Sequence, residues 1–347
     1  MATQSTMQAS GWTRAAPALL MMLLAPTFTE LLLGGTRLST LIAFPPVLLM
    51  EILVWGGGAV LLRALARKLK LGWTSLALFG LALAVAEEFV IQQTSLAPLV
   101  IQLKGASWGR ASGINYVYAL WALAYETVWV VLFPTWVAET VFPDRRDGTW
   151  VSKPMAAVLA ILFVAGAVMA WFAWTRIARI QTFHVGVFHP PWIALLVAVA
   201  AIGALFACGI AYAPTLRAAW LPARPAAVAL LGGLWGVLWF LLVVLAFGIA
   251  PQLPAPVVFA AAGIVLCLAV ATLARWTAHP AWTQRHAWCL FAGTLTGAMA
   301  SSFLGFRGAA LEDIVFKSVT NAIALLLVVW LGRRAAAYTG SLTTRST

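Results

Sequence analysis

Five glutamates lie in strongly apolar stretches of the chain, and they are the side chains best suited to chemistry. Glu87 and Glu88 are adjacent in the stretch AVAEEFVIQQ, with no lysine or arginine beside them. Glu30, Glu51 and Glu126 stand singly in similar surroundings. A charged side chain near the centre of a bilayer costs ~2.5–3.5 kcal/mol, so such residues usually face a bundle interior or a wet cavity. We therefore expect these carboxyls to mark a functional polar site.

Clustered carboxylates disfavour one another's ionisation, so some of them are expected to be neutral at pH 7 and to exchange protons. That is the chemistry of proton coupling or of cation binding. For any one glutamate the alternative is structural: a protonated or hydrogen-bonded acid that holds helices together. Five glutamates together favour a functional site.

Helical periodicity predicts different roles for the two adjacent glutamates. Glu88 and Gln92 share one face, one turn apart, whereas Glu87 points about 100° away. We therefore expect Glu88 to face the polar cavity, stacked over Gln92. Glu87 is expected to contact a neighbouring helix.

Other polar residues extend this predicted site. The loop KGASWGRASGINY contains Arg110, which would act as a counter-charge or lie solvated in the loop. Thr27, Thr29, Gln93, Asn115, Tyr116 and Tyr118 are further polar neighbours of the glutamates. The predicted substrate- or proton-binding residues are Glu30, Glu51, Glu87, Glu88, Gln92, Arg110, Tyr125 and Glu126.

Neither a cofactor nor a metal site is predicted. His184 and His189 lie five residues apart in TFHVGVFHPP, but this spacing matches no standard zinc pattern, and whether they bind metal stays open. All four histidines fall in predicted loops. The three cysteines are scattered and read as small core residues. No Walker loop, dinucleotide fingerprint or haem attachment motif occurs.

The elements that must position the glutamates are transmembrane helices. The chain is 63% hydrophobic and 9% charged, and its mean hydropathy is +0.95. Apolar stretches of about 20 residues recur, each long enough to cross a bilayer as a helix, and the alternation of a transmembrane barrel is absent. The sequence predicts an all-α polytopic bundle of ten helices, over residues 16–35, 44–66, 73–95, 116–138, 155–176, 191–213, 225–249, 257–275, 287–305 and 316–335.

The distribution of basic residues predicts that both termini are cytoplasmic. With the N-terminus inside, fifteen of the 22 Lys and Arg residues fall in cytoplasmic segments, as the positive-inside rule requires. The glutamates then lie in one band of depth, near the midplane of the membrane or in its outer half. The net charge of +12 fits a basic inner face against anionic lipids, without nucleic acid as a partner. We expect a multi-pass protein of the bacterial cytoplasmic (inner) membrane.

One integral membrane domain spans residues 1–347, with cytoplasmic tails at 1–15 and 336–347. The first helix is expected to be retained rather than cleaved as a signal peptide, because no clear A-x-A site follows it. Gly232-x-x-x-Gly236 and Gly293-x-x-x-Gly297 place small residues on one helix face. Such faces predict close helix packing, within the chain or in a homodimer.

Two resemblances accompany these patterns. The stretches TELLLGGT, EILVWGGGAVLLRALARKLKLGWTSLALFGLALAVAEE and FPDRRDGTW resemble a group of uncharacterised bacterial multi-pass membrane proteins, over roughly the first 150 residues. The pair Glu87-Glu88 also resembles the CAAX-protease and bacteriocin-processing family, whose signature is Glu-Glu-x-x-x-Arg with histidines on later helices. Here Gln92 stands where that arginine belongs, and Glu126 where a histidine would.

Three functions remain open at this point. The leading hypothesis is a carrier that uses the glutamates for protons or a small cationic solute. The second is a carboxylate-based intramembrane hydrolase, although an enzyme is the less favoured interpretation. The third is a non-catalytic membrane scaffold or assembly factor whose acids are structural.

Overall fold

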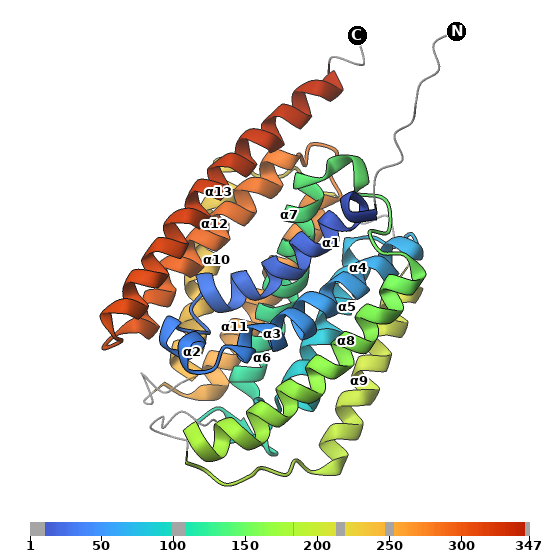
Figure 1. Cartoon of the computed structure of the whole chain (residues 1–347). Coiled ribbons are helices and arrows are strands. Elements are labelled where there is room, and N and C mark those ends of the chain that lie inside the picture. Colours follow the sequence, from blue (N-terminus) through green and yellow to red (C-terminus); the bar gives the residue numbers. More distant parts are fainter. Residues whose placement is uncertain (1–10, 99–107, 183, 213–218, 247–252, 344–347) are drawn as a thin grey trace.

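The protein is an all-α bundle in the computed structural model, which describes residues 11–98, 108–182, 184–212, 219–246 and 253–343. Ten helical spans in this part of the chain are long and apolar enough to cross a membrane, which confirms the prediction (Figure 1). They are Ala15–Leu32, Pro46–Lys68, Trp73–Ile91, Tyr116–Val141, Lys153–Gln181, Trp192–Ala211, Pro225–Leu245, Ala255–Thr277, Gln284–Phe306 and Leu311–Arg334. The chain is therefore a multi-pass membrane protein.

Each of the first five spans contains a π-helical segment. The elements of these spans are α1 (Gly11–Pro26) and η1 (Thr27–Leu32); α3 (Pro46–Glu51), η2 (Ile52–Gly56) and α4 (Gly57–Lys68); α5 (Trp73–Val85) and η3 (Ala86–Ile91); α6 (Tyr116–Glu126), η4 (Thr127–Leu132) and α7 (Phe133–Val141); α8 (Lys153–Phe172) and η6 (Ala173–Thr182). A π-turn bonds residue i to i+5, and such turns are frequent at functional sites.

The later spans are more regular. They consist of α9 (Trp192–Ala211), α10 (Pro225–Ala246), α11 (Ala255–Thr277), α12 (Gln284–Ser302) with the 3₁₀ turn η7 (Phe303–Phe306), and α13 (Leu311–Thr343). In Figure 1, α8 and α9 lie along one flank of the bundle and α13 along the other. Helices occupy parts of both predicted tails, since α1 begins at Gly11 and α13 continues to Thr343.

Three short elements between the spans were not predicted. These are α2 (Leu38–Ala43), the turn η5 (Pro143–Arg145) and a hairpin of β1 (Arg110–Ala111) and β2 (Ile114–Asn115). The hairpin leads directly into α6, whose first turn is capped by the Asn115 side chain, which accepts from the Tyr118 amide at 2.9 Å. The start of the fourth span is thus fixed by local hydrogen bonds.

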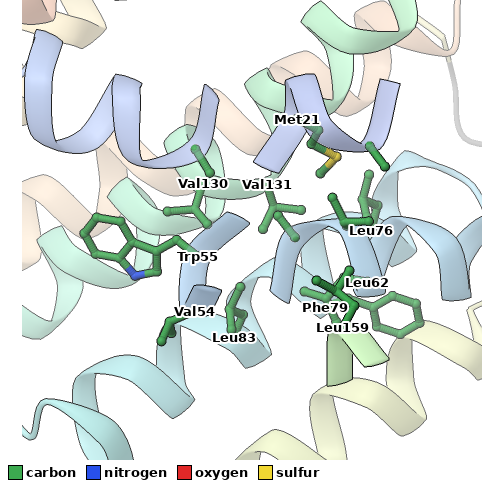
Figure 2. Packing of buried hydrophobic residues seen from close by; sticks show 14 of the residues in the cluster. Met21, Val54, Trp55, Leu62, Leu76, Phe79, Leu83, Val130, Val131 and Leu159 are labelled. Atoms are coloured by element: carbon green, nitrogen blue, oxygen red, sulfur yellow. The ribbon is translucent and has the colours of Figure 1, made fainter. Parts of the chain in front are cut away.

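The largest apolar core lies among the first five spans. Met21, Val54, Phe79, Val131 and Leu159 come from five different spans and meet there (Figure 2). Lipid is as apolar as these side chains, so close van der Waals packing, rather than escape from water, holds such helices together. This packing fixes the relative positions of the four spans that carry the glutamates.

The glycine motifs of α10 and α12 pack against each other within the chain. A Cβ built at Gly297 would collide with the carbonyl oxygen of Gly233, and one at Gly236 with that of Thr294. The prediction of close packing is therefore confirmed for the intramolecular case. A homodimer stays a prediction.

Candidate functional site

All five predicted glutamates lie at π-helical turns. Glu30 belongs to η1, and Glu87 and Glu88 belong to η3. Glu51 and Glu126 are the last α-helical residues before η2 and η4. Four of these side chains are buried, with exposed fractions between 1% for Glu87 and 8% for Glu30, and Glu51 is partly buried.

The five carboxyls lie within electrostatic range of one another and are called the carboxyl cluster below. Glu51 interacts with Glu30 and with Glu87. Glu126 interacts with Glu88, Glu87 and Glu30. Acids from four separate spans thus share one site, although up to 96 positions of sequence separate them in the chain.

Glu88 is the best-bonded member of the carboxyl cluster. Its Oε2 accepts hydrogen bonds from the hydroxyls of Thr94 and Ser95, the latter at 2.6 Å. Tyr118 and Glu126 also lie close to its side chain. Two carboxylates side by side repel each other, and a proton on one of them removes this repulsion.

Thr36 lies beside two further acids. Its hydroxyl donates to Oε2 of Glu30, and the side chain of Glu51 is close by. A threonine hydroxyl carries one proton, so while it donates to Glu30 it cannot donate to Glu51. Tyr125 lies near Glu30 and Glu51, and its hydroxyl donates to the carbonyl oxygen of Thr29 at 3.0 Å.

The predicted pairing of Glu88 with Gln92 is wrong. Gln92 Nε2 donates to Oε1 of Glu87 at 2.6 Å, and the Gln92 amide donates to the Glu87 carbonyl at 2.8 Å. The prediction assumed 3.6 residues per turn, whereas η3 follows the i to i+5 spacing of a π-helix. Glu87, the predicted helix contact, is the member that reaches Gln92.

Three members of the carboxyl cluster have a buried oxygen that no donor reaches. Taken as carboxylates, Glu51, Glu87 and Glu126 each have such an Oε2 among the residues that the structure describes. Within the described part of the chain, ion pairs join Glu139 to Arg63 and to Arg67, and no ion pair involves the carboxyl cluster. A buried carboxylate without a partner is very costly. Protons or a cationic ligand would satisfy these oxygens.

A metal cage is not formed by these acids in the described part of the chain. No group of three or more His, Cys, Asp and Glu side chains is arranged there to hold a metal ion. His279 and His286 hydrogen-bond to Ala281 and Thr283 near the turn between α11 and α12. The prediction that His286 lies in a loop is wrong. His286 lies in the first turn of α12, and its Nδ1 caps that helix.

Arg110 bonds to backbone oxygens. Its guanidinium donates to the carbonyls of Leu96, Ala97 and Gly113, at 2.8, 3.0 and 2.9 Å. Partial burial lowers the pKa of this guanidinium from its ordinary value, but arginine stays charged in proteins. Arg110 thereby ties the β1–β2 hairpin to the segment that follows η3. Its predicted role as a counter-charge stays a prediction.

Several buried charged groups were missed by sequence reasoning, among them Glu139 and Lys317. Glu139 accepts from Arg63 and Arg67 at the end of the bundle where α4 meets α7. Lys317 on α13 is 1% exposed, donates to the carbonyl of Leu32 at 2.8 Å and faces the ring of Phe303. Each of them stood near a predicted helix end, where a charge needs no explanation, so the pattern gave no signal.

Comparison of the chain with protein-family models, curated proteins and solved structures gives no match. The two resemblances drawn from sequence motifs therefore stay predictions. The site has to be interpreted from its own geometry.

Proposed function

We propose that this protein is a carrier of the bacterial cytoplasmic membrane that moves protons or a small cationic solute by way of the carboxyl cluster. The observation that supports this most is the set of buried carboxyl oxygens on Glu51, Glu87 and Glu126 that no donor reaches. Acids whose role is only to hold helices together are expected to have all their buried oxygens bonded.

The proton requirement of the paired groups supports the same function. Glu88 and Glu126 interact electrostatically, and a proton on one of them keeps the two from carrying like charges. Loss of that proton would leave two like charges together in an apolar bundle, which favours uptake of a proton or of another cation. Each loading state of the carboxyl cluster then has its own balance of charge, and a carrier couples such states to its two conformations.

The π-turns offer a way to move these acids. Converting a π-turn to regular α-helix removes one residue from the turn, which rotates the following side chains by about 100°. Such a change at η3 would redirect Glu87 and Glu88 together. We propose that the carboxyl cluster opens to alternate sides of the membrane through changes of this kind.

The function is tested by proton movement into liposomes that contain the purified protein and an internal pH dye. A negative-inside potential is imposed, with and without an outward gradient of choline, a small organic cation. The wild-type protein is expected to acidify the lumen in at least one condition, and Glu87→Gln is expected to abolish this. Glu312→Gln is the matched control, because Glu312 is exposed in the first turn of α13.

The proposal is overturned if wild-type liposomes behave as protein-free liposomes do in both conditions. It is equally overturned if Glu87→Gln and Glu126→Gln, folded as judged by gel filtration, carry protons at the wild-type rate.

A further inference from the structure

The four spans that carry the carboxyl cluster form two similar helical hairpins. The first repeat consists of spans one and two, Ala15–Leu32 and Pro46–Lys68, and the second repeat of spans three and four, Trp73–Ile91 and Tyr116–Val141. Consecutive crossings alternate in direction, so spans one and three run the same way. Transporters often contain such internal repeats, and their ion sites lie where the repeats meet.

The first span of each repeat ends in the same arrangement around an acid. Glu30 lies in η1 and Glu88 lies in η3. Six residues further along the chain, the hydroxyl of Thr36 donates to Oε2 of Glu30, and that of Thr94 donates to Oε2 of Glu88. In each case a residue of positive φ turns the chain back toward the acid. These residues are Gly34, with φ of 83°, and Gln93, with φ of 61°.

The second span of each repeat also carries an acid at a matching place. Glu51 and Glu126 are the last α-helical residues before η2 and η4. The π-turns that follow contribute to one apolar core, in which Val54 and Val131 lie (Figure 2). Each acid interacts electrostatically with the acid on the first span of its own repeat, Glu51 with Glu30 and Glu126 with Glu88.

Helix packing follows the same plan in both repeats. Within a repeat, α1 packs against η2 and α5 packs against η4. A glycine permits each of these contacts: a Cβ at Gly56 would collide with the carbonyl oxygen of Met22, and one at Gly80 would lie 3.2 Å from Val131. Between the repeats, α1 packs against α7 and α5 packs against α4. The carboxyl cluster thus lies where two similar hairpins meet.

The bonded and unbonded carboxyl oxygens follow the repeat as well. Glu30 and Glu88 each have a threonine donor. Glu51 and Glu126 each have a buried Oε2 that no donor reaches among the described residues, and Glu126 is 5% exposed. A buried carboxylate oxygen without a partner is costly, and a proton on that acid also removes the repulsion from the bonded acid beside it. Each repeat therefore offers one position for a proton.

One acid of the carboxyl cluster has no counterpart in the other repeat. Glu87 directly precedes Glu88, at the position that Thr29 occupies in the first repeat. Glu87 interacts electrostatically with both Glu51 and Glu126. It therefore belongs to both repeats.

We propose that the carboxyl cluster binds two protons, one at Glu51 and one at Glu126, and that Glu87 serves both positions. Thr36 and Thr94 act as positioning residues, since each holds the bonded acid of its repeat. This inference rests on the proposed function, because it gives the number of charges that the carrier loads.

Infrared difference spectroscopy between neutral and alkaline pH counts the protonated carboxyls without any need for transport. The purified protein is kept in a detergent without ester groups, so that the carbonyl stretch of protonated acids is visible. Glu51→Gln and Glu126→Gln are each expected to remove half of this band, and the double variant all of it. Glu312→Gln is the matched control and should leave the band unchanged, because an exposed carboxyl is ionised at both pH values.

A second pair of variants decides the matter if the glutamine variants fail to fold, as judged by gel filtration. Thr36→Val and Thr94→Val each remove a hydroxyl donor, so the proton moves toward the acid that has lost it and the carbonyl band shifts in both variants. Thr127→Val should leave the band in place, because the Thr127 hydroxyl donates to the carbonyl of Leu123 in its own helix at 2.7 Å.

Transfer of the unmatched acid to the other repeat tests the role of Glu87. Glu87→Thr is expected to abolish proton flux in liposomes. Thr29→Glu in the same protein should restore that flux, because it places the acid at the matching position of the first repeat. Thr27→Glu in the Glu87→Thr protein is the matched control and should not restore flux, since residues two apart on a helix do not share a face.

The inference is overturned if only one of Glu51→Gln and Glu126→Gln reduces the infrared band, or if Thr29→Glu restores no more flux than Thr27→Glu does. A band that is halved in both glutamine variants, without any flux in the wild type, would contradict the carrier and leave the two proton positions. Flux in the wild type, with a band that depends on only one of the two acids, would contradict the two positions alone.

Discussion

Removal of the Glu139 carboxyl is expected to destabilise the end of the bundle where α4 meets α7. Glu139 Oε1 accepts from Arg63 Nε and Nη2 at 3.0 and 2.8 Å, and from Arg67 Nε and Nη2 at 3.2 and 2.6 Å. Arg63 is 1% exposed. Glu139→Ala therefore leaves a buried guanidinium without its counter-charge.

The size of the effect follows from what Arg63 keeps. Its guanidinium still donates to the carbonyls of Gly148 and Arg146, at 3.0 and 2.6 Å, and lies 3.2 Å from the ring centroid of Trp150. Removing one partner of a buried pair costs ~3–5 kcal/mol, and these remaining contacts place Glu139→Ala near the lower limit. Glu139→Gln keeps an acceptor and should cost ~1.5–3 kcal/mol, the range for hydrogen bonds to charged groups.

The assay is unfolding in mixed detergent micelles, followed by circular dichroism. Arg67→Met is the matched comparison, because the Arg67 side chain is 17% exposed and its loss leaves the Arg63–Glu139 pair intact. It should cost about 1–2 kcal/mol, less than Arg63→Met. A free energy of unfolding that falls more in Arg67→Met than in Arg63→Met, or that is unchanged in Glu139→Ala, would refute this reasoning.

Two further predictions concern packing and topology. Gly297→Leu is expected to reduce the folded yield and the melting temperature, since any Cβ there meets the Gly233 backbone. Gly263→Leu should change neither, because a Cβ at Gly263 meets open space. Equal melting temperatures of the two variants would contradict the close packing of α10 and α12. Reporter proteins fused after Lys70 and after Lys153 are expected to lie in the cytoplasm, because basic residues are in excess in those segments. Export of either reporter would contradict the proposed orientation.

Hydropathy alone was enough to predict the number of spans and to identify the intramembrane acids as candidate site residues. Glu30 and Glu51 were identifiable because a carboxyl is rare and costly in a long apolar stretch. The residues that contact these acids in the fold were harder to predict from the sequence. Thr36 lies six residues after Glu30, in a segment without helical periodicity, so its hydrogen bond with Glu30 had no counterpart in the sequence pattern.

Local pairings within η3 could not be predicted, because a π-turn leaves no clear mark in composition. The composition of AEEFVI is that of an ordinary α-helix. The α-helical repeat therefore predicted that Gln92 pairs with Glu88, whereas it bonds to Glu87. Long-range contacts were out of reach for another reason. Arg63 and Glu139 are 76 residues apart, and the stacked pairs Trp121–Tyr125 and Trp235–Trp239 lie on α6 and α10. Only the packing of whole helices brings them together.

The two adjacent glutamates of η3 provide the most direct test of the central claim, that carboxyls without a donor carry the transported charge. Proton flux into liposomes and melting in detergent are measured for Glu87→Gln and Glu88→Gln. Glu87 has an oxygen that no donor reaches, whereas Glu88 is held by Thr94 and Ser95. The account predicts that Glu87→Gln abolishes flux and melts as the wild type does, while Glu88→Gln melts at a lower temperature. Full flux in Glu87→Gln, together with a lower melting temperature, would contradict it and make that acid a structural group.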